Sequence, residues 1–68
     1  MSTLKHLRTS RGLRLKDVAS EMGTDIGNLS RIESGKQAPS IHLARKLAAF
    51  YAITLEEVFS GVIDEKAA

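Results

Sequence analysis

Several residue types are absent or scarce in this sequence. It has no cysteine and no tryptophan, and only one proline, one tyrosine and two phenylalanines in 68 residues. Without cysteine there is no disulfide framework and no thiolate metal site, which suits a reducing compartment. No apolar run approaches the roughly 18 residues of a membrane span, and the N-terminus lacks the apolar stretch of a signal peptide. We therefore expect a cytoplasmic protein with no membrane partner.

Acidic residues are missing from the N-terminal end. The first fourteen residues hold four Lys or Arg and one His, with no Asp or Glu, whereas four of the eight acids lie among the last thirteen residues. The net charge is only +2, so the uneven distribution matters more than the total. It favours an anionic partner at the basic end, and the alternative is a scatter of solvated charges.

Groups of residues that could carry out catalysis are also missing. The two histidines, His6 and His42, are far apart in the sequence, and no Ser/His/Asp set or converging carboxylate pair is visible. Glu56 and Glu57 are adjacent and would point about 100° apart on a helix. There is no glycine-rich phosphate loop. We expect that the protein is not an enzyme and binds no cofactor, metal or small-molecule ligand.

Apolar residues recur with helical spacing along the whole chain, and no stretch alternates as a strand would. Glycines at 12, 23, 35 and 61 are placed to end helices, and Asp25, Ser40 and Thr54 to begin them, with Glu57 completing a capping box. The sequence thus predicts one all-α, compact five-helix domain over residues 1–68, with a tail at 61–68. The expected inner faces hold Leu4, Leu7, Leu15, Val18, Ala19, Met22, Leu29, Ile32, Ile41, Ala44, Leu47, Ala48, Tyr51, Leu55, Val58 and Phe59.

Residues 15–34 have the features of a helix-turn-helix. The chain must turn between Met22 and Asp25, and Gly23 can adopt a positive φ there without a steric penalty. Ala19 is small, so the next helix can cross closely over it. Two helices at a steep angle around a short turn that contains glycine define this motif.

The outward face of the third predicted helix suits a duplex groove. On a helical wheel Leu29 and Ile32 point inward, whereas the opposite side carries small or polar residues. A side chain such as Arg31 can bind guanine bidentately, Asn28 can bind adenine, and Ile26 can contact a thymine methyl. Gly27 would let the backbone approach. Three alternatives stay open: Ile26 lies in the core, the helix starts after Gly27, or Arg31 is only a solvated charge.

Glu33 is predicted to lie on the inner side of the third helix, where its carboxylate needs a cation. Arg8, on the inner edge of the first helix, is the natural partner and could form a structural guanidinium–carboxylate pair. The alternative is two independent surface charges.

The segments LKHLRTSRGL, KDVASEMG, LSRIESGKQAPSIHLARKLA and ITLEEVF resemble the Cro/C-repressor type (XRE-like) helix-turn-helix family, which includes phage repressors. The resemblance extends from about Leu4 to Phe59. It implies a lambda-repressor-like DNA-binding domain with Asp25 to Ser34 as recognition helix. Base contacts are implied for Ile26, Gly27, Asn28 and Arg31, together with the Arg8–Glu33 pair. Phosphate contacts are expected from Arg14, Ser30, Ser34, Lys36, Gln37, Ser40 and His42.

The sequence departs from the family pattern in two places. Arg14 and Leu15 stand where a Thr or Ser cap followed by Gln is usual, so Arg14 is expected to replace a phosphate contact. Ala52 stands where the family has a glycine before the last helix.

The expected partner is double-stranded DNA, and the expected function is transcriptional regulation, as a bacterial or phage-encoded repressor. One small domain offers few contacts, so we expect a homodimer on a pseudo-palindromic operator. The alternative is a protein-interaction module on the same fold, such as an antitoxin or a transcriptional adaptor. The predicted dimer interface consists of Leu55, Phe59, Val62 and Ile63.

Overall fold

Five helices form the part of the chain that the computed structural model describes, namely the backbone of residues 3–63 and the side chains of residues 4–59. No strand occurs within these limits, so the all-α prediction is confirmed. None of the described helices is long and apolar enough to cross a membrane. The helices are α1 (Thr3–Ser10), α2 (Leu15–Met22), α3 (Ile26–Glu33), α4 (Ile41–Tyr51) and α5 (Leu55–Ile63).

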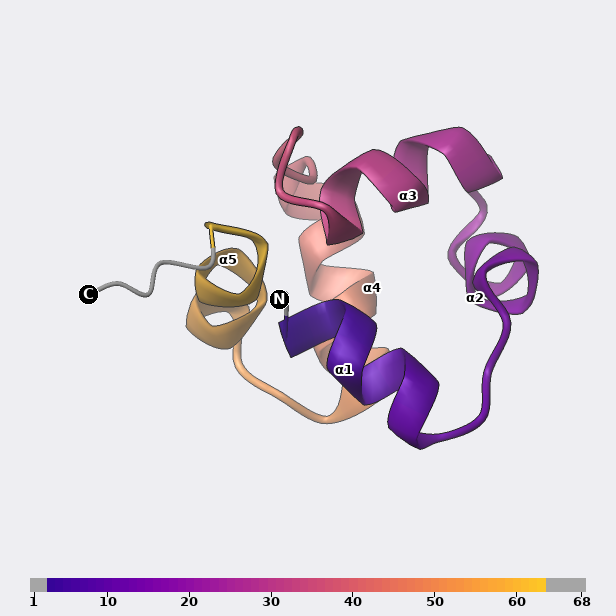
Figure 1. Cartoon of the computed structure of the whole chain (residues 1–68). Helices are drawn as coiled ribbons and strands as arrows, with labels where there is room; N and C mark the ends of the chain where they lie inside the picture. Colours follow the sequence, from indigo (N-terminus) through magenta and orange to yellow (C-terminus); the bar gives the residue numbers. More distant parts are fainter. Residues whose placement is uncertain (1–2, 64–68) are drawn as a thin grey trace.

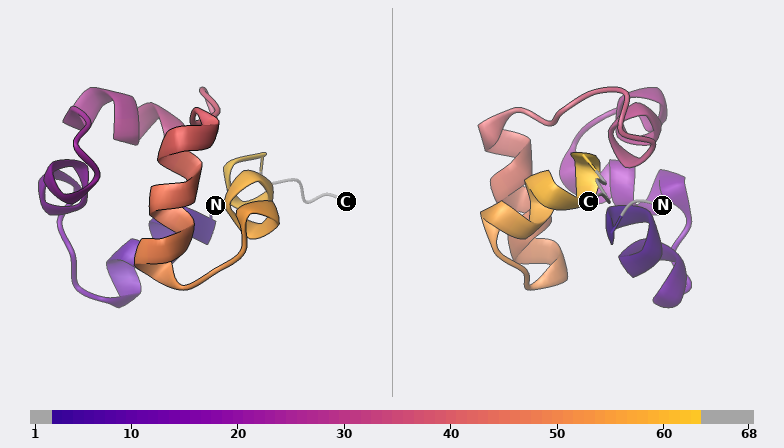
Figure 2. Two further views of the ribbon diagram at one scale, coloured as in Figure 1. Left: turned by 180° about the vertical axis from the view of Figure 1, so that it is seen from behind. Right: turned by 60° about the vertical axis from the view of Figure 1, so that its left-hand side comes forward.

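The helices pack around one another at steep angles. In Figure 1, α3 runs along one edge of the molecule, α2 is seen nearly end-on beside it, and α1 lies in front of α4. Helix α5 packs against both α1 and α4, and α2 packs against α3. Figure 2 shows α4 from the opposite side, where it connects the loop after α3 to the turn before α5. The outer side of α3 is therefore left uncovered by the other helices.

A single core joins all five helices. Its buried hydrophobic residues come mainly from the positions that the apolar spacing predicted. Leu7, Leu15, Ala48, Leu55 and Phe59 are partly buried against this core. The buried residues are Leu4, Val18, Ala19, Met22, Leu29, Ile32, Leu43, Ala44, Leu47, Tyr51 and Val58.

Most predicted helix ends are confirmed. The backbone of Gly23 has φ 72°, and the N–H groups of Gly23 and Thr24 bond back to the last turn of α2. The Asp25 carboxylate accepts from the Asn28 N–H at 3.0 Å, and the Ser40 hydroxyl from the Leu43 N–H at 3.1 Å. These caps satisfy backbone donors that a helix leaves unpaired at its first turn.

The capping box before α5 is also present. The Thr54 N–H donates to the Glu57 carboxylate at 2.9 Å, and the Glu57 N–H donates to the Thr54 hydroxyl at 3.0 Å. This reciprocal pair satisfies two donors at the start of the helix, as the spacing of these residues predicted.

Two of the predictions are wrong. Helix α5 continues through Gly61 to Ile63, because an internal glycine costs only about 1 kcal/mol relative to alanine and does not by itself stop a helix. Ile41 is 55% exposed, and Leu43 is buried instead. The buried side of α4 is centred between Leu43 and Ala44, which turns Ile41 in the first helical turn away from the core.

Ala52 forms the turn between α4 and α5 in a conformation that usually needs glycine. Its backbone has φ 58° and ψ 46°, and it is the only non-glycine residue with positive φ in the described chain. The N–H of Ile53 donates to the Ala48 carbonyl at 2.9 Å, which closes α4. The left-handed conformation costs an L-residue about 1–2 kcal/mol, so strain is stored at this turn.

Replacing Ala52 by glycine should therefore stabilise the protein. Ala52 is exposed, so the variant loses no packing, and relief of strain should exceed the added unfolded-state entropy by about 0.5–1 kcal/mol. The matched control is Ala49→Gly in the exposed part of α4, which should destabilise by about 0.5–1 kcal/mol. Urea unfolding measures both. A loss of stability in Ala52→Gly would contradict the left-handed turn.

Tyr51 lies at the end of α4 with its ring in the core. The guanidinium carbon of Arg11 is 5.1 Å from the ring centroid, and Arg11 Nη2 donates to the Tyr51 carbonyl at 3.1 Å. The Tyr51 hydroxyl is buried, and within the described chain it has no hydrogen-bond partner. Burial, and then the nearby Glu33 carboxylate, raise the pKa of Tyr51 above its ordinary value of 10.0.

Because the pKa of Tyr51 is raised in the folded protein, the free energy of unfolding changes with pH in the alkaline range. Above about pH 10 the hydroxyl ionises more readily in the unfolded chain, which then binds fewer protons than the folded chain, so the free energy of unfolding falls. Tyr51→Phe removes this loss together with an unsatisfied hydroxyl.

The Tyr51→Phe variant should match or exceed the wild-type stability at pH 7, by up to about 1 kcal/mol. Its advantage should grow toward pH 11. Denaturant unfolding at both values measures this, and Lys titration is common to both proteins because no lysine is changed. A clear destabilisation at pH 7 would mean that the hydroxyl makes a hydrogen bond that stabilises the fold.

Candidate nucleic-acid interface

The helix-turn-helix is built by α2, the turn at residues 23–25 and α3. Ala19 is 2% exposed at the crossing, so α3 approaches α2 over a small side chain. Leu29 and Ile32 anchor the inner side of α3 in the core. Figure 1 shows α3 across the view and α2 nearly along it, which is the steep crossing that the motif requires.

The outer side of α3 is open. Ile26 is 49% exposed, which excludes the alternative that places it in the core. Helix α3 begins at Ile26, so the alternative in which the helix starts after Gly27 is also wrong. Ser30, Arg31 and Ser34 are exposed. A strip that begins with the apolar Ile26 and continues with polar and cationic residues therefore faces outward along the helix.

Gly27 makes room for two charged side chains. A Cβ at this position would lie 3.1 Å from Asp25 Oδ2 and 3.4 Å from Arg31 Nη1. The first distance is tighter than ordinary van der Waals contact, so a larger residue would push on the capping carboxylate. The missing side chain thus serves the local arrangement of Asp25 and Arg31 as well as leaving the surface open.

The side chains of Asn28 and Arg31 are joined through the loop after α3. Asn28 Nδ2 donates to Thr24 Oγ1 at 2.8 Å, and Asn28 Oδ1 accepts from Gln37 Nε2. Gln37 Oε1 in turn accepts from Arg31 Nε at 3.1 Å. Gln37 is predicted above to bind phosphate. Helical spacing cannot reveal these hydrogen bonds, since Gln37 is nine residues from Asn28.

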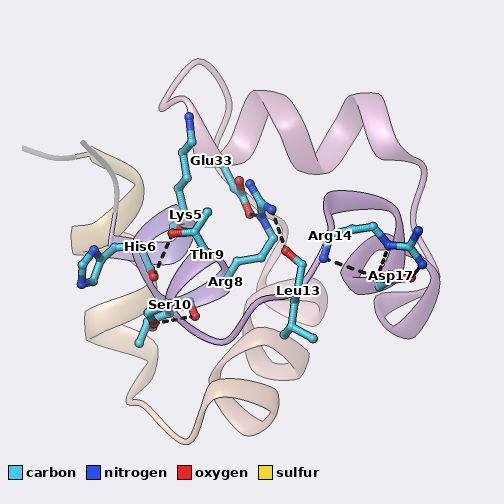
Figure 3. A network of polar contacts seen from close by, with 10 residues as sticks. Lys5, His6, Arg8, Thr9, Ser10, Leu13, Arg14, Asp17 and Glu33 are labelled. Carbon is cyan, nitrogen blue, oxygen red and sulfur yellow. Dashed lines mark hydrogen bonds and ion pairs between the residues drawn. The ribbon is translucent and has the colours of Figure 1, made fainter.

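Arg8 and Glu33 lie side by side beneath the C-terminal end of α3. Arg8 Nε donates to Glu33 Oε2 at 2.8 Å, and the two side chains are 12% and 6% exposed. Arg8 Nη1 donates to the Leu13 carbonyl at 2.9 Å, just before α2 (Figure 3). One guanidinium therefore holds both the end of α3 and the segment before α2.

Arg14 stands at the start of α2 and is bound to its own helix. Its Nε donates to Asp17 Oδ2 at 2.9 Å, and the Asp17 carboxylate also accepts from the Arg14 N–H at 3.3 Å (Figure 3). The side-chain hydrogen bond from Arg14 lowers the pKa of Asp17, and Asp17 raises the pKa of Arg14. The Arg14 side chain is 70% exposed, so it stays accessible to a phosphate although it is already paired.

The other residues predicted to bind phosphate lie around both ends of α3. Lys36 is exposed in the loop after α3, and His42 is exposed in the first turn of α4. The Ser40 hydroxyl caps α4, and Ser34 Oγ donates to the Arg31 carbonyl at 3.1 Å. Polar groups thus border the open strip on the side of the loop and α4.

A shallow hollow adjoins the N-terminal end of α3, and one of its residues, Lys46, is not among the predicted site residues. Lys46 Nζ donates to the Met22 carbonyl at 3.3 Å and so caps the C-terminus of α2. The position of Lys46 on the exposed side of α4 gave no sequence signal for this contact. Its charge adds a cation to the rim. The hollow is lined by Met22, Gly23, Thr24, Asn28, Ser40, His42, Leu43 and Lys46.

The residues predicted for a dimer interface are only partly described. Leu55 and Phe59 are half-buried and pack against the core of their own chain. The side chains of Val62 and Ile63 lie outside the described residues. Within the described chain no group of three or more His, Asp or Glu residues could hold a metal ion.

Comparison with known proteins agrees with this geometry. A family model described as Helix-turn-helix matches residues 4–58. The chain is 41% identical over 59 residues to the HTH-type transcriptional regulator DdrOP3 of Deinococcus deserti, covering 87% of this chain and 46% of the relative. It therefore spans about half the length of that relative.

Two further relatives are covered to a greater extent. An uncharacterized HTH-type transcriptional regulator of Methanocaldococcus jannaschii, MJ0272, is 36% identical over 62 residues, with 91% of this chain and 94% of the relative covered. The cryptic phage CTXphi transcriptional repressor RstR, from Vibrio cholerae, is 34% identical over 68 residues, with 96% and 61% covered. Among solved structures there is no significant match.

Proposed function

The chain belongs to the Cro/C-repressor type helix-turn-helix family, and from this premise we propose that it binds double-stranded DNA sequence-specifically and regulates transcription, as a repressor. The observation that carries the proposal is the open outer side of α3, with Ile26, Ser30 and Arg31 exposed while Leu29 and Ile32 hold the helix in the core. A helix anchored in this way can enter a major groove without rearranging the fold.

Each reading residue has a distinct chemical role in the proposal. Arg31 offers a guanidinium that fits guanine O6 and N7, and Asn28 offers an amide that fits adenine N6 and N7. Ile26 supplies an apolar contact for a thymine methyl, and Gly27 allows close approach. Arg31 keeps its terminal nitrogens for a base because only its Nε is bonded to Gln37.

Phosphate contacts would fix the register of α3 in the groove. Lys36 and His42 flank the strip from the loop and from α4, and Arg14 flanks it from α2. The hydroxyls of Ser30, Ser34 and Ser40 are further candidates, since serine donates readily to phosphate oxygens. Such contacts carry no sequence information, so they supply affinity rather than specificity.

A homodimer follows from the small size of the reading surface. Two copies would present their α3 helices to half-sites about 34 Å apart, on one face of a pseudo-palindromic operator. Leu55 and Phe59 on α5, with Val62 and Ile63, are the proposed interface. A DNA target of this kind would place the protein in the cytoplasm. One relative is named a phage repressor, which favours repression over activation.

Exposed hydrophobic side chains suggest a second candidate function. Ile26 and Ile41 are the exposed large hydrophobic residues of the described chain, at 49% and 55%. An antitoxin or transcriptional adaptor could use them to bind a protein. The two functions differ in their electrostatics, because phosphate contacts release counterions and an apolar interface does not.

Selection from a pool of random DNA duplexes tests the function directly. We expect a selected site with two inverted half-sites, and affinity for it that falls steeply between 50 and 200 mM salt, by at least about a hundredfold for several phosphate contacts. A single half-site would contradict the dimer. No enrichment at low salt would contradict DNA binding and favour the protein-interaction module.

Two substitutions separate base reading from phosphate binding. Arg31→Ala should cost about 1–3 kcal/mol on the selected site and relax preference at one base pair. Lys36→Ala should weaken all sequences alike and reduce the salt slope by about one. Both residues are exposed, so the fold should tolerate either change. Equal losses on every sequence for Arg31→Ala would remove its base-reading role.

A further inference from the structure

We propose that Gln37 is a positioning residue that determines sequence specificity, because it sets the orientation of the Asn28 amide and holds Arg31 beside it. The inference rests on the proposed function and deepens it. Gln37 lies outside α3, in the loop that follows, yet its two amide atoms contact the side chains of both residues. Two of the predicted reading residues are thereby joined into one unit through a residue that the helix does not contain.

Arg31 determines which group donates and which accepts in each of these hydrogen bonds. A guanidinium has donors only, so the atom of Gln37 that faces Arg31 must be the oxygen. The Gln37 nitrogen then faces Asn28 and donates to Asn28 Oδ1. This leaves the Asn28 nitrogen to donate to Thr24 Oγ1 at 2.8 Å. One obligatory donor therefore removes the ambiguity between oxygen and nitrogen in both amides.

The backbone of the loop places Gln37 at this point. The Lys36 N–H donates to the Arg31 carbonyl at 2.9 Å, and the Gly35 N–H donates to the Ile32 carbonyl at 3.1 Å, with Gly35 at φ 81°. Pro39 is buried. The loop is thus folded back on the end of α3, and the half-buried Gln37 side chain is held against the helix before any partner arrives.

The orientation of the Asn28 amide matters because adenine presents its acceptor and its donor in a fixed order. Its major-groove edge presents an acceptor at N7 and a donor at N6, so the Asn28 oxygen and nitrogen must arrive in one order and not the other. After its hydrogen bonds to Thr24 and Gln37, the Asn28 amide can still bind a base, because one N–H and one carbonyl lone pair remain. The hydrogen bond from Gln37 to Asn28 Oδ1 therefore sets the side on which the Asn28 amide presents its oxygen to a base.

A direct phosphate contact by Gln37 is the competing explanation, and it makes a different prediction. Loss of a phosphate contact weakens all sequences alike. Loss of a positioning contact changes preference at the base pairs read by Asn28 and Arg31 and leaves the other positions unchanged.

The test uses Gln37→Met, which has similar length and neither polar atom, and Gln37→Glu, which keeps an acceptor for Arg31 and loses the donor for Asn28. The neighbouring Lys36→Met is the matched control, because it removes a charge from the same loop. NMR spectra of the free proteins report the Asn28 Nδ2 protons and the exchange of the Arg31 Nε proton. Thermal unfolding verifies that each variant is folded.

In the free protein, Gln37→Met should speed exchange of the Arg31 Nε proton and shift the Asn28 signals. Gln37→Glu should keep Arg31 protected and shift Asn28 alone, because the carboxylate can only accept and favours the reversed amide. Lys36→Met should change neither. Unaltered Asn28 and Arg31 signals in Gln37→Met would overturn the inference.

With duplexes selected from a random pool, Gln37→Met should reduce preference at two base pairs by about fivefold or more while the salt slope stays unchanged. Lys36→Met should reduce the slope and keep the preference. A reduced slope with unchanged preference in Gln37→Met would overturn the positioning role in favour of phosphate binding. Failure of the wild-type protein to bind any duplex would overturn the proposed function, whereas the free-protein spectra test the hydrogen-bond chain without DNA.

Discussion

The buried carboxylate of Glu33 is the constraint on which the arrangement of the helix-turn-helix depends. A desolvated carboxylate is costly unless it is paired, and removing one partner of a buried ion pair typically costs about 3–5 kcal/mol. Here Arg8 Nε lies 2.8 Å away, and the same guanidinium also binds the Leu13 carbonyl. One side chain of α1 therefore ties down the end of α3 and the segment that leads into α2.

This attachment divides α3 into two sides with different tasks. Leu29 and Ile32 keep the inner side in the core, and Glu33 adds a polar contact that has one suitable partner. The outer side is not needed to hold α3 in the core, which explains why it can carry an exposed isoleucine and a glycine. Gly27 lowers helix propensity, and the tertiary anchoring of the inner side offsets that cost.

Local signals in the sequence predicted most of the fold, because caps and apolar spacing act within a few residues. Asp25, Ser40 and Gly23 were assigned correctly for this reason. The predictions for Ile41 and Gly61 were wrong because both depend on more than the neighbouring residues. Whether Ile41 is buried depends on how far the buried face of α4 turns toward Leu43. Whether α5 ends at Gly61 depends on whether the rest of the helix is stable enough to tolerate an internal glycine. The left-handed turn at Ala52 was indicated only by the glycine that the family has at this position, since alanine disfavours the conformation it adopts there.

The candidate site was predictable only in part, for the same physical reason. Helical spacing identified which residues of α3 face outward, but it could not reveal Gln37, which reaches Asn28 only after the loop folds back. The cap of α2 by Lys46 likewise links residues that are 24 positions apart. Long-range polar contacts depend on how the helices and loops pack in the folded protein, and they leave no periodic pattern in a single sequence.

The hydrogen-bond chain also bears on how a domain with so few contacts could bind tightly. Immobilising a flexible polar side chain on association costs about 0.5–1.5 kcal/mol, and arginine, glutamine and asparagine would each incur this cost if they were free. In this chain Arg31, Gln37 and Asn28 are already held by one another before a ligand arrives. In the proposed complex the ordering cost would therefore be met during folding, where the packing of the loop against α3 offsets it, and more of each base contact would remain as binding free energy. The same hydrogen bonds limit the surface to one arrangement of donors and acceptors, so in the proposed complex affinity and specificity would have a single structural cause.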